Sequence, residues 1–149
     1  MLRHSRLEES LGVILANKLQ TPEMSAIMLR DLIGEALVRD PTILPSIRAD
    51  LHAARTRDPA ARGYAQPFLY YKGFHALEMY RVAHAMWSQG RHALASHLQN
   101  RISEVFGVDI HPAARIGCGV IIDHGTSVVI GETAVVEDDV SMLHEVTLG

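Results

Sequence analysis

The hydrophobic positions between residues 110 and 149 recur with a spacing of six. An aliphatic residue or alanine stands at every step of the series Ile110, Ile116, Ile122, Val128, Ala134, Val140 and Val146. An α-helix would repeat near 3.6 residues and a half-buried strand near 2, so neither explains this spacing. A period of six is typical of a β-helix built from hexapeptides. We therefore predict short strands joined by corners, with three hexapeptides and about eighteen residues in each coil.

The part of the chain before residue 107 has apolar residues at helical spacing instead. The pattern predicts helices over residues 5–20, 21–39, 44–56, 71–88 and 91–105. Thr21 and Pro22 suit the cap and the first residue of the second helix, and Pro41 stops it. Gly107 ends the helical pattern, and no linker rich in Gly, Ser or Pro follows. We expect an α + β chain, with a helical domain over residues 1–107 packed against the start of a β-helix domain over residues 108–149.

The hexapeptides supply only a little over two coils by residue 149. Solenoids generally need three or more repeats and a cap that covers their ends. The last unit stops at Thr147-Leu148-Gly149, in the middle of a repeat. We therefore expect that the sequence is truncated at its C-terminal end, or that association protects the open end.

The composition of the chain argues against two classes of binding partner. The net charge is −3, and no run of basic residues is longer than two, which argues against binding to nucleic acid or to an anionic membrane surface. The apolar stretches are too short to span a bilayer. A single cysteine, Cys118, suits a reducing compartment, so we expect a cytoplasmic protein.

Four polar residues stand out among the hexapeptides: Asp109, His111, Asp123 and His124. Asp109 and His124 are fifteen positions apart, which is a little less than one coil and could bring their side chains together on adjacent rungs. A histidine can accept a proton near neutral pH, and a neighbouring carboxylate stabilises the imidazolium that forms. Such a pair can activate a hydroxyl group. The residues alone equally allow His124 to be a solvated corner residue beside Asp123. Aromatic residues such as Tyr71 are expected to pack between helices.

Six segments carry a more specific signal than the period does. They are RDPA (57–60), YKGFHAL (71–77), VDIHPAARIG (108–117), DH (123–124), IGETAVV (130–136) and VTLG (146–149). In their order and spacing they resemble the serine O-acetyltransferases of bacterial and plant cysteine biosynthesis, a family of hexapeptide-repeat acyltransferases.

The resemblance implies a fold, an assembly and a reaction. The fold is a helical N-terminal domain followed by a left-handed parallel β-helix. The assembly is a homo-oligomer, either a trimer or a dimer of trimers joined through the helices, with active sites between neighbouring β-helices. The reaction moves an acetyl group from acetyl-CoA to the hydroxyl of L-serine without a metal, giving O-acetylserine and CoA in the first step of cysteine biosynthesis. The family's tail, which binds O-acetylserine sulfhydrylase, is not among these residues.

The resemblance also implies roles for individual residues. His124 matches the family's general base, and Asp109 matches the carboxylate paired with it. Asp58 and Asp123 match the two aspartates that hold the amino-acid substrate. The family's second active-site histidine, its carboxylate-binding arginine and most of its CoA groove would follow Gly149, so the CoA-contacting residues stay unknown and the chain alone could be inactive.

Two other functions compete with this interpretation. A zinc hydratase of the gamma carbonic anhydrase type is also a trimeric β-helix and would need three converging histidines, for which His111, His124 and His144 are candidates. That family has no helical domain in front of its β-helix. The second alternative is a non-catalytic assembly module, in which the helices oligomerise and no activity depends on His124.

Overall fold

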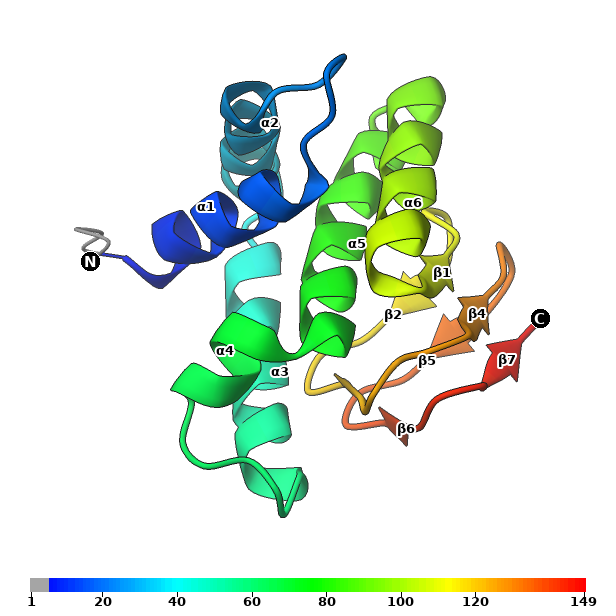
Figure 1. The fold of residues 1–149 in the computed structure, drawn as a ribbon. Coiled ribbons are helices and arrows are strands. Elements are labelled where there is room, and N and C mark those ends of the chain that lie inside the picture. Colours follow the sequence, from blue (N-terminus) through cyan, green and yellow to red (C-terminus); the bar gives the residue numbers. More distant parts are fainter. Residues whose placement is uncertain (1–5) are drawn as a thin grey trace.

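The computed structural model describes residues 6–149. Within that range the helices are α1 (Leu7–Leu19), α2 (Ala26–Arg39), α3 (Ile43–Arg57), α4 (Ala65–Tyr70), α5 (Lys72–Ser88) and α6 (His92–Phe106). The strands that follow are β1 (Val108–Ile110), β2 (Arg115–Ile116), β3 (Ile121–Ile122), β4 (Val128–Ile130), β5 (Val135–Val136), β6 (Ser141–Met142) and β7 (Thr147–Leu148). The helices lie on one side of the strands, with α5 in the middle of the molecule (Figure 1).

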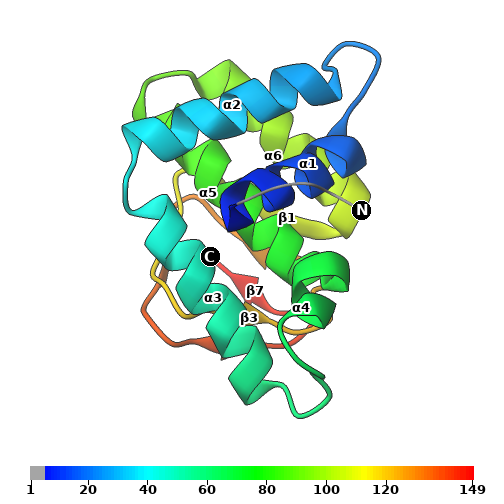
Figure 2. The same cartoon turned by 90° about the vertical axis from the view of Figure 1, so that its left-hand side faces the viewer.

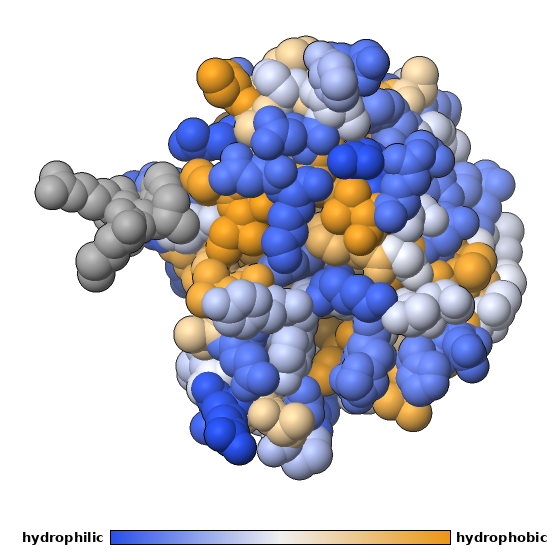
Figure 3. Space-filling model, in the orientation of Figure 1, coloured by the Kyte–Doolittle hydropathy of each residue, from blue (hydrophilic) through white to orange (hydrophobic). Residues whose placement is uncertain are grey.

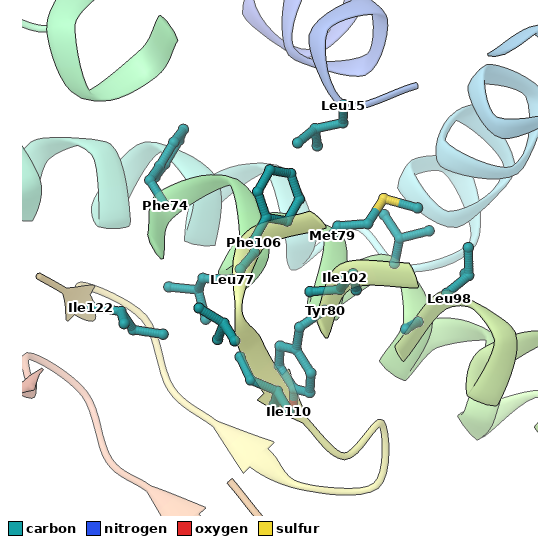
Figure 4. Close-up of a cluster of buried hydrophobic side chains, with 14 of the residues drawn as sticks. Leu15, Phe74, Leu77, Met79, Tyr80, Leu98, Ile102, Phe106, Ile110 and Ile122 are labelled. Carbon is teal, nitrogen blue, oxygen red and sulfur yellow. The ribbon is translucent and has the colours of Figure 1, made fainter. Parts of the chain in front are cut away.

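The helix α5 forms the centre of the hydrophobic core. It packs against α2, α3 and α6 as well as against β1 and β3, and α3 and α4 lie beside it over β3 (Figure 2). Figure 4 shows Tyr80 of α5 beside Ile110 of β1, with Leu77, Ile102 and Phe106 close to them. One continuous core therefore joins the helices to the first coil. The absence of a flexible linker after Gly107 predicted this packing.

The five predicted helices are confirmed, with two corrections. The second helix does not begin at Thr21-Pro22, because Thr21 and Met24 close a separate turn through their backbone groups. It begins at Ala26, where the Ser25 hydroxyl accepts a hydrogen bond from the Met28 amide at 3.3 Å, as an N-cap does. The short helix α4 was not predicted. It contains Pro67, which is tolerated there because the amides of a first turn have no partner within the helix.

The strands pair only with strands of neighbouring coils. Three parallel sheets result, with strand orders β1-β4-β7, β2-β5 and β3-β6. All seven residues of the six-residue series belong to the hydrophobic core or pack against it. The predicted fold class, a helical domain followed by a parallel β-helix, is confirmed.

The length of the first coil differs from the prediction. Ile110 pairs with Ile130, Ile116 with Val136 and Ile122 with Met142, which is a shift of 20 residues on each face. The next rung pairs Ile130 with Leu148, a shift of 18 residues. The first coil therefore contains two more residues than the predicted eighteen, and they lie in the corner between β3 and β4.

The sequence pattern conceals these two residues. Strands β1 and β4 each bury two residues that are two positions apart, Val108 with Ile110 and Val128 with Ile130. Up to Ile122, each member of the six-residue series occupies the second of the two buried positions in its repeat. From Val128 onward, each member occupies the first of these two positions. Because both positions are apolar, the period continues across the insertion.

A buried ion pair connects the helices to the first coil. Arg81 of α5 donates two hydrogen bonds to Oδ2 of Asp50 in α3, from Nη2 at 2.6 Å and from Nε at 3.0 Å. The same Nη2 donates to the Gly117 carbonyl at 2.8 Å, while Oδ1 of Asp50 accepts from the Val120 amide at 2.8 Å. Asp50 and Arg81 thus fix α3 and α5 to the segment that leads into β3.

A second carboxyl group lies against this pair. Glu78 is 1% exposed, and its Oε2 is 3.4 Å from Nε of Arg81. Neither of its oxygens accepts a hydrogen bond from any residue in the described part of the chain. Burial, and after it the negative charge of Asp50, raise the pKa of Glu78 well above its ordinary value, although Arg81 acts in the opposite direction. Glu78 therefore retains its proton to a higher pH in the folded protein than in the unfolded chain.

We predict that the Glu78→Gln substitution stabilises the protein increasingly as pH rises. Above pH 4.5, the ordinary pKa of a glutamate, the unfolded chain releases a proton that folded Glu78 retains, so the stability falls with rising pH by up to about 1.4 kcal/mol per pH unit. The effect ends when pH passes the folded-state pKa. Glutamine keeps the shape of the protonated acid but has no proton to lose.

Urea unfolding of the two proteins at pH 5 and at pH 8 measures this difference. The stability of the variant relative to the parent should increase between the two pH values. A difference that is the same at both would show that Glu78 has no raised pKa.

Candidate functional site

The corner between β3 and β4, residues 123–127, contains the two extra residues of the first coil. The backbone is left-handed at His124 (φ 59°), Gly125 (φ 77°) and Ser127 (φ 60°), a conformation that costs residues other than glycine some free energy. The Gly125 amide donates to the Asp123 carbonyl at 2.7 Å. His124 projects from this corner with 76% of its side chain exposed, and its ring faces that of His144 in the next coil, with 6.1 Å between the ring centroids.

The start of α5 lies directly on the end of β3. A Cβ atom placed on Gly73 would be only 2.0 Å from the Ile122 carbonyl oxygen, so no residue with a side chain fits at this position. Beside it, Nζ of Lys72 donates to Oγ1 of Thr126 at 2.5 Å. These contacts hold the first turn of α5 against the 123–127 corner.

The end of α3 supplies Asp58. Its Oδ1 accepts a hydrogen bond from the Ala60 amide at 2.8 Å, and its Oδ2 accepts one from the Tyr71 hydroxyl at 2.7 Å. The preceding residue, Arg57, donates from Nη1 to the Asp139 carbonyl at 2.7 Å and to the Ser141 hydroxyl at 2.8 Å. Asp58 is therefore fixed on both sides, by its own hydrogen bonds and by the attachment of Arg57 to the second coil.

Three of the four predicted site residues meet in one cavity. Asp58, Asp123 and His124 line a hollow of about 410 Å³ together with Tyr71 and Lys72. Oδ1 of Asp123 lies 3.9 Å from Nε2 of His124. Two carboxylates beside one histidine can bind a cationic group and accept a proton from a neighbouring hydroxyl.

The fourth predicted residue, Asp109, is not in the lining of this cavity. It lies on β1, and its Oδ1 accepts a hydrogen bond from Nε2 of Gln99 in α6 at 2.8 Å. Among residues 6–149, no hydrogen bond or ion pair joins Asp109 to His124. Their pairing in a catalytic dyad stays a prediction.

Sequence reasoning missed the part that Tyr71 plays in this site. It assigned Tyr71 to packing between helices, and Tyr71 does pack against the hydrophobic core, but its hydroxyl also binds Asp58 at the cavity. Burial, followed by the hydrogen bond and charge of Asp58 and then by the charge of Asp123, raises the pKa of Tyr71 to about 12. Its place in the YKGFHAL segment was the only available signal, because its partner is thirteen residues away.

Of the three histidines considered for a zinc site, His124 and His144 lie near each other, with 6.1 Å between their ring centroids, but His111 is held elsewhere. The ring of His111 packs edge-on against Trp87 at 5.0 Å between centroids, and Nδ1 of His111 accepts from the Ala113 amide at 3.1 Å. Within the described residues, no group of three His, Cys, Asp or Glu side chains is placed to hold a metal ion. The gamma carbonic anhydrase alternative therefore has no support from this placement.

Hydrophilic residues cover most of the face seen in Figure 3, with apolar patches over α1. None of the helices described in residues 6–149 has both the length and the apolar character needed to cross a membrane.

Comparison with known proteins gives consistent matches along the chain. The family model described as "Serine acetyltransferase, N-terminal" matches residues 1–79. The serine acetyltransferase of Escherichia coli K12 is 54% identical over all 149 residues, which correspond to 55% of that protein. The chain thus spans about half the length of the curated relatives that it matches.

Solved structures show the same similarity in three dimensions. A serine acetyltransferase in complex with CoA is 50% identical with a TM-score of 0.95, and the match covers 99% of this chain and 63% of that one. The serine acetyltransferase of Neisseria gonorrhoeae in complex with serine is 48% identical with a TM-score of 0.95, covering 97% and 60%.

Proposed function

The chain belongs to the serine acetyltransferase family, and on this basis we propose that the protein transfers an acetyl group from acetyl-CoA to the hydroxyl of L-serine. The products are O-acetylserine and CoA. The observation that carries the proposal is the cavity in which Asp58, Asp123 and His124 meet. The complexes of similar proteins with CoA and with serine support the choice of substrates.

The two carboxylates bind the substrate in this mechanism. Asp58 and Asp123 hold the ammonium group of L-serine, because two negative charges at one cavity stabilise a single cation. The ammonium and hydroxyl groups of serine are attached to adjacent carbon atoms. Anchoring the ammonium therefore keeps the hydroxyl close to His124, which borders the same cavity.

His124 then acts as the general base. It removes the hydroxyl proton as the serine oxygen attacks the carbonyl carbon of the acetyl thioester. When the tetrahedral intermediate collapses, the carbon–sulfur bond breaks, and the thiolate of CoA takes the proton from the imidazolium. An uncharged hydroxyl is a weak nucleophile, and base assistance of this kind contributes roughly 10²–10⁴-fold.

Asp109 is the positioning residue for the imidazolium in this proposal. Gln99 binds its Oδ1, and its Oδ2 accepts no hydrogen bond from the residues that the structure describes. We propose that Oδ2 pairs with His124 when substrate is bound. We propose that the reaction needs no metal and that it is the first step of cysteine biosynthesis in the cytoplasm, where an O-acetylserine sulfhydrylase would consume the product.

We further propose that the protein is a homo-oligomer, a trimer or a dimer of trimers. The outer surface of the β-helix exposes Val135 (56%) and Leu143 (57%), and α2 exposes Ile27 (72%) and Val38 (84%). Large apolar side chains exposed on these two parts of the protein are candidates for burial in protein interfaces. In this arrangement the β-helices form the trimer, and the helical domain, residues 1–107, joins trimers.

Replacing His124 by Ala should lower the rate of thiol release from acetyl-CoA in the presence of L-serine by about two orders of magnitude or more. His52→Ala is the matched control, since His52 is exposed and its ring contacts Tyr64, and neither residue lines the cavity. An unchanged rate in a folded His124→Ala protein would remove His124 from the mechanism. The assay uses the full-length protein, because the 149 residues span only about half the length of the relatives. A full-length parent that releases no thiol would contradict the proposed activity itself.

Replacing Asp58 or Asp123 by Asn should weaken L-serine binding by about ten-fold or more, because a neutral amide loses the attraction to the ammonium. Binding of CoA should change little. Calorimetric titration with each ligand measures both effects, and Asp31→Asn on the exposed face of α2 serves as the control. If the affinities for L-serine and for CoA fell equally, that result would contradict an ammonium-binding role for the two aspartates.

Replacing Val135 by Glu should reduce the size of the assembly, because a charge would be buried in the proposed trimer interface. Sedimentation velocity of the parent, of Val135→Glu and of the exposed corner control Thr133→Glu measures this. A monomeric parent would contradict the oligomer. A Val135→Glu protein of unchanged size would show that this face is not the interface.

A further inference from the structure

The phenol of Tyr71 lies at the candidate ammonium site, where it contacts Asp58. Its hydroxyl is 2.7 Å from Oδ2 of Asp58, and Asp58, Tyr71 and Asp123 line the same cavity. We propose that Tyr71 is a substrate-binding residue whose phenolic oxygen accepts the third hydrogen bond from the ammonium group of the amino acid. The inference rests on the proposed function, because it takes L-serine as the ligand.

The backbone of Tyr71 is held firmly in place. Its N–H donates to the Pro67 carbonyl of α4 at 3.2 Å, and its carbonyl accepts from the His75 amide of α5 at 3.0 Å. Two residues later, Gly73 makes its close approach to the Ile122 carbonyl, and Asp123 follows Ile122 directly. The backbone that carries the phenol is therefore fixed against the residue before Asp123, and the hydroxyl is fixed to Asp58 by its hydrogen bond.

The direction of the Tyr71–Asp58 hydrogen bond determines what the phenol can offer a ligand. An ionised carboxylate only accepts hydrogen bonds, so the hydroxyl must be the donor. With its single proton committed to Asp58, the phenolic oxygen has only lone pairs left for a group in the cavity. The raised pKa of Tyr71, about 12, keeps this proton in place throughout the neutral range.

A primary ammonium group matches this set of acceptors. It carries three N–H donors, and the cavity offers three acceptors in the Asp58 carboxylate, the Asp123 carboxylate and the Tyr71 oxygen. The two carboxylates provide the negative charge that attracts the ammonium. The phenol oxygen accepts the third N–H hydrogen bond without adding further negative charge. A site of this kind favours a primary ammonium over a methylated one, which has fewer N–H groups.

The test compares Tyr71→Phe with the parent protein by calorimetric titration. Phenylalanine keeps the ring and removes only the hydroxyl, and affinity for L-serine should fall about ten-fold, because the lost hydrogen bond involves a charged group. Affinity for CoA should not change. Tyr64→Phe is the control, because it removes a phenol that binds His52 on the surface, outside the cavity.

Titration with N-methyl-L-serine separates direct binding from a merely structural role. In the parent, this ligand lacks one of the three N–H groups and should bind more weakly than L-serine. In Tyr71→Phe the third acceptor group is gone, so the preference for L-serine should shrink by about the same ten-fold factor. If Tyr71 had only a structural role, Tyr71→Phe would lower the affinity for both ligands equally. The preference for L-serine over N-methyl-L-serine would then be unchanged.

The other outcomes distinguish this inference from the proposed function. If the parent binds L-serine and Tyr71→Phe binds it equally well, or if the preference over N-methyl-L-serine stays constant, the role of Tyr71 is overturned while the proposed function stands. If the parent does not bind L-serine, the proposed function fails and this inference fails with it.

Discussion

The ion pair between Arg81 and Asp50 determines how the two parts of the protein are placed relative to each other. Transferring both charges out of water costs several kcal/mol per ion, and the attraction between them often does no more than offset that cost. The pair contributes orientation more than stability, because Arg81 donates a hydrogen bond to the Gly117 carbonyl while Asp50 accepts one from the Val120 amide. A purely apolar contact could slide, whereas these hydrogen bonds allow one position of α3 and α5 over the strand that leads to the site.

The site is made by three chain segments that meet where that strand ends. The end of α3 brings Asp58, the start of α5 brings Tyr71, and the corner after β3 brings Asp123 and His124. None of the three segments could form the site alone. Gly73 sets the distance between two of them, because its contact with Ile122 leaves no space for a side chain. Residues that never touch a substrate therefore control how far apart the charged groups of the cavity lie.

The sequence predicted the parts of the structure that depend on local spacing. The helices other than α4 and the coil core follow from periodicity, and Asp58, Asp123 and His124 at the cavity follow from a segment resemblance. The insertion in the first coil escaped because both Val128 and Ile130 are apolar, so either fits the period. The roles of Tyr71 and Arg81 depend on partners 13 and 31 positions away in sequence. Nothing in the local pattern indicates such partners.

The 123–127 corner also shows how a coiled chain can grow without losing its core. The two additional residues lie between β3 and β4, where the backbone is left-handed at His124, Gly125 and Ser127, and not inside a strand. Strand β4 therefore pairs with β1 residue for residue and buries the same two of its three positions. Elongation confined to a corner lets a regular scaffold acquire an irregular, chemically equipped segment while the apolar interior above and below it continues unchanged.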